Sequence, residues 1–215
     1  MTRAPGFCGV ILAAGASTRM GRDKALLPWP ADLTTPTTWR QTFLGAAIEM
    51  LRPHTDLVMV VAGANENSVM PVVYSAGAFL ITNPNPELGQ FSSLQVGLQE
   101  VMNRGRDAAM VALVDRPPVL PKTVEALRAA FIAAPDPIWA VVPEFQGKHG
   151  HPYVMGREMI GAFLRAPVTA TAQDVEHANQ AHILYQPVND PHVCSNIDTP
   201  EDFQNLSQSH TGPTH

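Results

Sequence analysis

Glycine, hydroxyl and cationic side chains are concentrated in one short segment near the amino terminus. Gly15 and Gly21 allow the backbone to approach an anion and to point its N–H groups at it. Arg19 and Lys24 add positive charge within the same ten residues, and Ser17 adds a hydroxyl donor. The segment follows an apolar run and matches neither the dinucleotide fingerprint nor the P-loop. It predicts a phosphate-binding loop in preference to a turn that carries two solvated basic residues.

Two aspartates lie where a metal ion that bridges phosphates would need ligands. Asp115 directly follows the apolar run 109–114, at the end of a predicted strand. Magnesium in phosphate sites takes one or two carboxylates and keeps several waters. A turn or cap residue is the structural alternative for Asp115. For Asp198 that alternative is strong, because the residues after it begin a helix well, with Thr199 or Glu201 as the cap.

A stretch with two prolines and a glycine connects a predicted strand to a predicted helix. Asn83 begins this stretch, Gly89 lies in its middle, and Ser92 and Ser93 are placed to cap the helix. From the residues alone it is an ordered connection.

Histidine and cysteine form no recognisable metal or redox centre in the sequence. His149 and His151 lie two residues apart in a glycine-containing turn, without an accompanying cysteine or carboxylate cluster. A surface turn is the commoner explanation. Cys8 and Cys194 fit no metal or redox spacing, and Cys8 is expected to be a small buried residue in a strand.

Short apolar runs alternate with helical periodicity along most of the chain. Strands are predicted over residues 9–14, 57–62, 79–81, 109–114, 139–142, 152–155, 183–188 and 193–197. Helices are predicted over residues 39–50, 92–102 and 121–133, and again after Asp198. The alternation predicts an α/β fold of three layers, with a mostly parallel central sheet and helices on both faces. Ligands of such sheets bind beyond the carboxyl ends of the strands.

Length and composition limit the class of protein. A chain of 215 residues suits one large domain, expected over residues 1–206, with a polar and flexible tail over 207–215. The formal net charge of −5 argues against binding to nucleic acid. No stretch approaches the ~20 apolar residues of a membrane span, and the amino terminus lacks a signal-peptide pattern. A cytoplasmic protein that binds no membrane is therefore expected.

The glycine-rich segment as a whole resembles a known signature. The run L-A-A-G-x-S-x-R-M-G-x-x-K-x-L-L-P, which ends at Pro28, is similar to that of nucleotidyltransferases with the glycosyltransferase-A type of fold. It is most similar to the group of molybdenum cofactor cytidylyltransferases and guanylyltransferases. The resemblance implies a single nucleotidyltransferase domain with the fold of nucleotide-diphospho-sugar transferases. It also implies that this loop wraps a nucleoside triphosphate and that Lys24 binds the phosphates.

Two further motifs of that family bear on the metal. Asp115 and Pro117 match its D-x-P motif, and Asp198 matches its I-D-T-P motif. The resemblance implies that both aspartates bind Mg²⁺. Arg116 departs from the neutral residue expected there, and it is placed to perturb the metal or to contact a phosphate.

Motifs of the same family also imply which residues bind the two substrates. His151 matches a G-H-P motif that lines the acceptor pocket, whereas His149 departs from the family pattern. The N-P-x(4)-G-x-x-[ST]-S motif is matched from Asn83 to Ser93 and holds the nucleotide base in the family. The implied nucleotide-binding residues are Leu12, Ala13, Ala14, Gly15, Ser17, Lys24, Asn83, Gly89, Ser92 and Ser93.

The resemblance implies transfer of CMP from CTP to the terminal phosphate of the molybdopterin cofactor, with release of pyrophosphate and with Mg²⁺ as cofactor. Lys24 and Arg19 would stabilise the leaving phosphates, and Asp115 completes the catalytic set. CTP is preferred because the loop reads L-A-A-G where guanylyltransferases usually have L-A-G-G. GTP, a sugar- or polyol-phosphate acceptor, and a non-catalytic carrier of molybdenum cofactor remain the alternatives. A molybdoenzyme of the xanthine dehydrogenase type, or its chaperone, is the implied recipient.

Overall fold

The computed structural model of the chain describes residues 5–15 and 20–210. The strands are β1 (Phe7–Leu12), β2 (Leu57–Ala62), β3 (Phe79–Thr82), β4 (Ala108–Leu113), β5 (Ala140–Phe145), β6 (Lys148–His149), β7 (Tyr153–Gly156) and β8 (Ile183–Pro187). The α-helices are α1 (Phe43–Leu51), α2 (Glu66–Ser75), α3 (Gln90–Asn103), α4 (Pro121–Ala133), α5 (Arg157–Arg165), α6 (Ala172–Ala178) and α7 (Pro200–His210). Two short 3₁₀ helices matter for the site, η2 (Lys24–Leu26) and η7 (Pro191–Cys194).

The strands form one sheet in the order β3-β2-β1-β4-β7-β5-β6, and β8 pairs with β5. β1, β2, β3 and β4 pair in parallel, as do β5 and β8. β7 runs antiparallel to both of its neighbours, β4 and β5. The mostly parallel sheet predicted from the sequence is therefore confirmed. Because β1 and β4 are neighbours, the loops that follow them lie at the same edge of the sheet.

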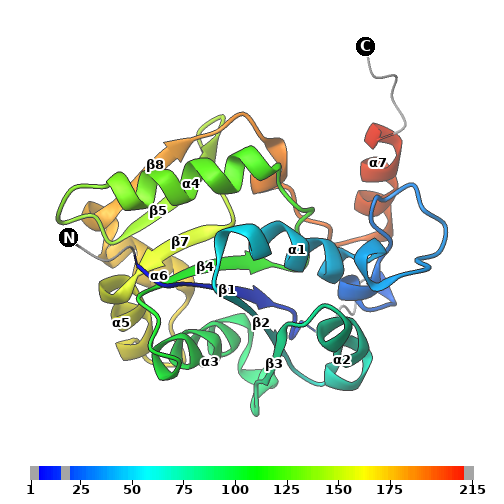
Figure 1. Cartoon of the computed structure of the whole chain (residues 1–215), viewed down its shortest axis with the longest axis horizontal. Coiled ribbons are helices and arrows are strands. Elements are labelled where there is room, and N and C mark those ends of the chain that lie inside the picture. Colours follow the sequence, from blue (N-terminus) through cyan, green and yellow to red (C-terminus); the bar gives the residue numbers. More distant parts are fainter. Residues whose placement is uncertain (1–4, 16–19, 211–215) are drawn as a thin grey trace.

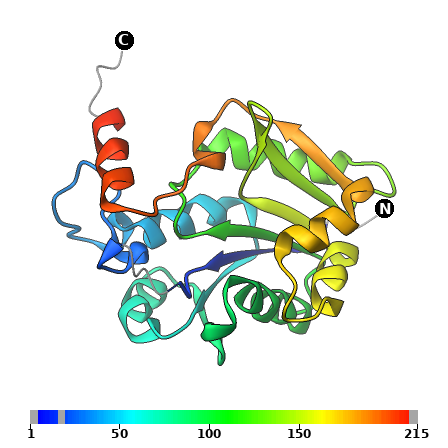
Figure 2. The same ribbon diagram turned by 180° about the vertical axis from the view of Figure 1, so that it is seen from behind.

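Helices cover both faces of the sheet and enclose two apolar cores (Figures 1 and 2). On one face, apolar side chains of α1, α2 and α4 pack on alternate residues of β1 and β2. On the other face, α3, α5 and α6 cover the remaining residues of the same strands. In β1, for example, Ile11 points into the first core and Val10 into the second, and both are fully buried. This alternation explains the continuous apolar run of the strand, which is buried on both faces.

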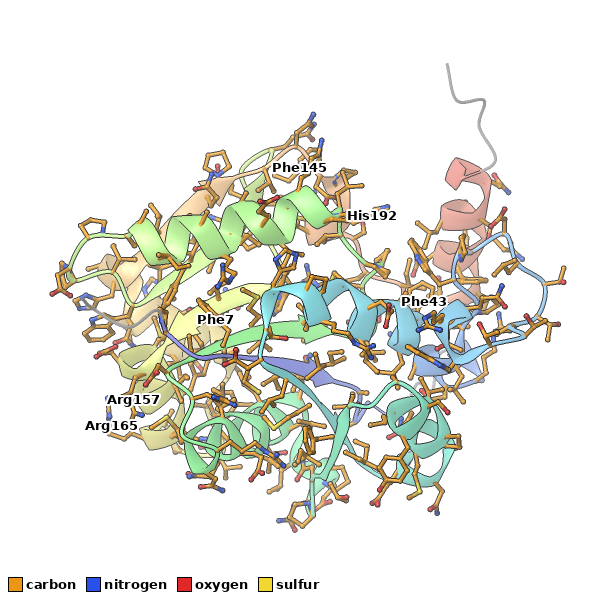
Figure 3. The ribbon with its side chains drawn as sticks, viewed as in Figure 1. Phe7, Phe43, Phe145, Arg157, Arg165 and His192 are labelled. Carbon is orange, nitrogen blue, oxygen red and sulfur yellow. The ribbon has the colours of Figure 1, made fainter. Side chains whose placement is uncertain are left out.

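Helix α7 lies beside the main body and closes a third, smaller apolar cluster (Figures 1 and 2). The ring of Phe203 on α7 contacts the ring of Phe43 at the start of α1, with 6.0 Å between centroids; Phe43 is labelled in Figure 3. The helix continues to His210, so the expected tail 207–215 is wrong in its first four residues. The hydroxyl of Ser207 donates to the carbonyl of Ala31 at 2.6 Å, which ties this part of α7 to the body.

Some of the predicted elements are wrong in extent or in type. The strand predicted over 193–197 does not form; Asp190 instead caps η7 by accepting a hydrogen bond from the backbone N–H of His192. The helix predicted over 39–50 is interrupted at Thr42, which caps α1 through Gly45. Helix α3 begins at Gln90 rather than at Ser92, with Gly89 at its N-cap and no side-chain cap.

In the part of the chain that the structure describes, no helix combines the length and the apolar character needed to cross a lipid bilayer.

Candidate active site

A cavity of about 690 Å³ lies at the carboxyl ends of β1, β2 and β4, where the alternation of strands and helices predicts a ligand. We refer to it as the first cavity. It is lined by Leu12, Ala14, Gly15, Asp23, Lys24, Ala64, Asn65, Pro86, Glu87, Gly89, Gln90, Ser93, Val114 and Asp115. Ser17 and Arg19 belong to residues 16–19, outside the described part of the chain.

Lys24 meets both predicted metal ligands at this edge of the sheet. Its Nζ lies 2.7 Å from Oδ1 of Asp198 and 3.8 Å from Oδ2 of Asp115. The Lys24 side chain is 12% exposed, so these charges interact with little screening by solvent. The second oxygen of Asp115, Oδ1, is buried and has no hydrogen-bond partner among the described residues. The structure thus brings Asp115 together with Lys24 and Asp198, which are 174 positions apart in the sequence.

Asp23 and Asn65 hold the start of η2, and with it Lys24, against β1. Asp23 is the N-cap of η2 and accepts from the backbone N–H of Ala25 at 3.0 Å. The Asn65 side-chain amide donates to Oδ2 of Asp23 at 2.8 Å and to the carbonyl of Ala13 at 2.9 Å. The loop after β2 is therefore tied to the loop after β1, and the tie fixes the position from which Lys24 extends.

Asp198 is positioned by a backbone hydrogen bond and by a helix cap. The N–H of Ile197 donates to the carbonyl of Asp115 at 2.8 Å, which brings the two carboxylates into one neighbourhood. Asp202 accepts from the backbone N–H groups of Asp198 and Thr199, while its own N–H donates to the Thr199 hydroxyl. This reciprocal cap begins α7. It leaves the Asp198 carboxylate to Lys24, so Thr199 supplies the cap as predicted.

The predicted base-binding stretch is organised around a buried amide. Nδ2 of Asn83 donates to the hydroxyls of Ser92 and Ser93, both at 2.9 Å. Asn83 is 3% exposed and lies behind the lining of the cavity, as does Ser92. Gly89 and Ser93 line the first cavity itself. Asn83 thus holds the entry to α3 in place, and its contact with a base stays a prediction.

Ala13 likewise lies behind the cavity. It is 1% exposed, and its carbonyl accepts a hydrogen bond from the Asn65 side-chain amide. Ala14 and Leu12 remain in the lining. Gly63 allows the close approach of these loops: a Cβ on it would lie 3.1 Å from the Ala14 carbonyl oxygen and 2.8 Å from a carbon of Pro86.

His151 lies in a separate cavity of about 470 Å³, which we call the second cavity. Its lining is Leu12, Leu88, Gln90, Phe91, Leu94, Val111, Leu113, His151, Tyr153, Met155, Val168, Thr169, Ala170, Thr171, Ala172 and Glu176. Leu12 and Gln90 line both cavities, so the two adjoin. Burial, and secondarily the nearby Arg116 charge, lower the pKa of His151 to about 3. The ring is therefore neutral at physiological pH.

Arg116 does not extend to the first cavity. Its guanidinium donates to the carbonyl of Val193, which also accepts from the backbone N–H of His151. A Cβ on Gly150 would lie 1.9 Å from that same carbonyl oxygen, so only glycine fits there. Arg116 therefore fixes the turn that carries His151, and its predicted effect on a metal or a phosphate stays a prediction.

Several lining residues of the first cavity are not predicted by any motif. Asp23, Ala64, Asn65 and Gln90 are the main examples. Asp23 carried a usable signal, because an aspartate directly before a helical turn is a typical N-cap. Asn65 also follows a predicted strand at its carboxyl end, which is where side chains that contact a ligand collect.

The fold and this grouping of charged residues beyond the carboxyl ends of β1 and β4 are those of a nucleotidyltransferase. Comparison with protein families agrees, since residues 9–183 match the MobA-like NTP transferase domain. The chain belongs to this family.

Individual relatives are similar at modest identity. A probable molybdenum cofactor guanylyltransferase from Rhodopirellula baltica is 32% identical over 113 residues, which are 53% of this chain and 50% of that protein. This chain thus spans half the length of that relative. The molybdenum cofactor cytidylyltransferase of Escherichia coli is 23% identical, over 94% of this chain and 96% of that protein. The crystal structure of Rv0371c from Mycobacterium tuberculosis H37Rv shares the fold, with a TM-score of 0.75 and 24% identity over 94% of this chain and 98% of that one.

Proposed function

We propose that the chain is a Mg²⁺-dependent nucleotidyltransferase that transfers CMP from CTP to the terminal phosphate of molybdenum cofactor. One observation carries the proposal. Lys24, Asp115 and Asp198 converge at the edge of a cavity large enough for a nucleoside triphosphate. The match to the MobA-like NTP transferase domain supports a nucleoside triphosphate as the ligand of this cavity.

The proposed reaction needs positioning and charge stabilisation more than acid–base chemistry. An oxygen of the acceptor phosphate attacks the α-phosphorus of CTP, and the bond from that phosphorus to the bridging oxygen of the β-phosphate breaks. The nucleophile is already an anion, so no general base has to remove a proton. Negative charge accumulates on the leaving pyrophosphate, and the Lys24 ammonium is placed to stabilise it. Arg19 is proposed to assist, although it lies outside the described residues.

The two aspartates suit a hard divalent cation. Oδ1 of Asp115 is buried without a partner among the described residues, and the carboxylates of Asp115 and Asp198 both lie within 4 Å of Lys24 Nζ. No group of three or more metal-ligating side chains occurs among the described residues. Magnesium bound to a nucleotide commonly uses one or two carboxylates and takes its other ligands from phosphate and water. When bound, the ion would neutralise phosphate charge; Asp115 and Asp198 would hold it.

The choice of CTP rests on the L-A-A-G form of the loop, in which Ala14 lines the first cavity. GTP is the second candidate, because the relative from Rhodopirellula baltica is named a guanylyltransferase.

The carrier alternative loses its main motivation, since Arg116 donates to the Val193 carbonyl. The cytoplasmic location and the recipient molybdoenzyme of the xanthine dehydrogenase type, or its chaperone, stay predictions.

Pyrophosphate release from each of the four NTPs, with and without molybdopterin cofactor and Mg²⁺, tests the proposal. We expect release from CTP only when acceptor and Mg²⁺ are both present, and formation of the cytidylylated cofactor. A higher kcat/KM with GTP than with CTP would make GTP the nucleotide substrate, and the proposed nucleotidyl transfer would still hold. No turnover with any NTP, in a protein that binds the acceptor, would contradict the proposal.

A further inference from the structure

The second cavity is lined mainly by apolar side chains and adjoins the first. Its walls include Phe91 and Leu94 from α3, Val111 from β4 and Met155 from β7. With a volume of about 470 Å³ it has room for a fused bicyclic ring. Glu176 and Tyr153 line this cavity and not the first. A ligand that spans the two would therefore present different chemistry at its two ends.

Besides Nδ1 of the His151 ring, two polar groups that line this apolar space have no hydrogen-bond partner among the described residues. The carboxylate of Glu176, on α6, has no hydrogen bond or ion pair among the described residues. The Tyr153 residue is 3% exposed, and its hydroxyl is buried without a hydrogen-bond partner among the described residues. Burial raises the pKa of Glu176 to about 7, and it raises the pKa of Tyr153, with a further contribution from Glu176. Buried polar groups nearly always find a partner, so the unpaired Tyr153 hydroxyl, beside the partly buried carboxylate of Glu176 in the same cavity, indicates a ligand.

The charge of Glu176 limits what that ligand is. A carboxylate accepts hydrogen bonds and repels phosphate, so the phosphate end of an acceptor is directed away from Glu176 and toward the first cavity. A carboxylate pairs best with two parallel N–H donors. A pterin carries such an edge in its 2-amino-4-oxopyrimidine ring, where the ring N–H and the exocyclic amino group lie side by side.

We infer that Glu176 recognises the amino-pyrimidinone edge of a pterin ring in the acceptor, while the Tyr153 hydroxyl binds a further polar atom of that ring. The inference rests on the proposed function in placing the acceptor phosphate beside the α-phosphorus of a nucleotide in the first cavity. It adds the residues that distinguish a pterin phosphate from a sugar or polyol phosphate, neither of which has a flat ring with two parallel N–H donors. Both residues are recognition groups and take no part in bond making.

Equilibrium binding of 6-hydroxymethylpterin, followed by ligand fluorescence at pH 8, tests the inference. The matched ligand is 6-hydroxymethyllumazine, which has oxygen in place of the 2-amino group. We expect wild type to bind the pterin at least tenfold more tightly than the lumazine. Glu176→Gln should weaken pterin binding by about tenfold to a hundredfold, which is the usual effect of losing a hydrogen bond to a charged group. It should also abolish the preference for pterin over lumazine. Glu158→Gln, an exposed change on α5, is the control and should bind as wild type does.

Tyr153→Phe provides a second variant that keeps the cavity filled. It should weaken pterin binding by about threefold to tenfold without lowering the melting temperature, because the hydroxyl has no partner to lose. Equal binding of pterin by wild type and Glu176→Gln would overturn the inference, as would equal binding of pterin and lumazine by wild type. Weaker binding of CTP or GTP in Glu176→Gln would overturn it as well, since it would place the nucleotide base in this cavity. Failure of nucleotidyl transfer alone would overturn the proposed function and leave the binding result in place.

Discussion

The two adjoining cavities satisfy their polar groups in opposite ways. In the first cavity, Lys24 pairs with Asp198, and Asn65 connects Asp23 to the backbone of β1. In the second cavity, Glu176 and the Tyr153 hydroxyl have no such partners among the described residues. Contacts among its own polar side chains fix the first cavity, whereas the second cavity has polar groups that form no such contacts.

This difference suits the chemistry of the two proposed substrates. A triphosphate carries several negative charges, and its site gains from donors that are fixed before it binds, because no reorganisation is then needed during the reaction. A neutral ring binds mainly through burial of its apolar surface. Two unpaired polar groups in the pocket weaken the binding of any ring that cannot form hydrogen bonds with them. We therefore expect changes in the first cavity to reduce turnover, and changes in the second to alter acceptor binding.

The largest effect is expected from Lys24→Met, which removes the ammonium and keeps most of the side-chain volume. Turnover should fall by about 10²–10³-fold, the scale for the loss of one donor that stabilises transition-state charge. Steady-state pyrophosphate release measures it, and Lys122→Met on the exposed surface of α4 is the control. Turnover within threefold of wild type would show that Lys24 has only a structural role beside Asp115 and Asp198.

A smaller effect is expected from Asn65→Ala. The change removes three side-chain hydrogen bonds: one that Asn65 accepts from the Gly63 N–H, and two that it donates to Asp23 and to the Ala13 carbonyl and that position the turn from which Lys24 extends. At about 1 kcal/mol for each bond, kcat/KM for CTP should fall by roughly tenfold to thirtyfold. The exposed Asn103→Ala on α3 should not change it. An unaltered kcat/KM in Asn65→Ala would show that the position of Lys24 does not depend on the Asn65 hydrogen bonds.

The second cavity makes a prediction about pH and stability. Because burial raises the Glu176 pKa from 4.5 to about 7, the folded state favours the protonated acid. Stability is therefore lost as pH rises from about 4.5 through 7, and the full cost, on the order of 2–3 kcal/mol, applies above 7. Tyr153 and Tyr185 are the other titratable groups that this carboxylate influences.

Glu176→Gln removes that cost. At pH 8 the variant should melt several degrees above wild type, and the difference should shrink toward zero at pH 4.5. Thermal melts across this range, with Glu158→Gln as the control, measure it. A variant that is equally or less stable than wild type at pH 8 would contradict the burial of an unpaired carboxylate.

Much of the first cavity follows from the sequence because its residues come directly after predicted strands. Once β1 and β4 are recognised as buried strands, their carboxyl ends must meet, and Lys24 and Asp115 come with them. The position of Asp198 also follows, since its segment begins a helix with an evident cap. Their catalytic and metal-binding roles stay predictions.

Other features depend on tertiary packing that no local pattern carries. Helix α2 has Pro71 in its interior, which obscures its start and end in the sequence. Asn83 precedes a loop in a way typical of a binding residue, yet the approach of α3 buries it behind Ser92 and Ser93. Glu176 is one acid on a short helix; only the packing of α6 beside β7 places it next to Tyr153 in a cavity.

The central claim is that the two cavities bind different substrates, and equilibrium binding of CTP with Mg²⁺ tests it most directly. Titration calorimetry on wild type, Lys24→Met and Glu176→Gln compares the two cavities with one ligand. We expect Lys24→Met to weaken CTP binding by at least tenfold and Glu176→Gln to bind CTP as wild type does. Equal binding by wild type and Lys24→Met, or a loss in Glu176→Gln as large as that in Lys24→Met, would contradict it.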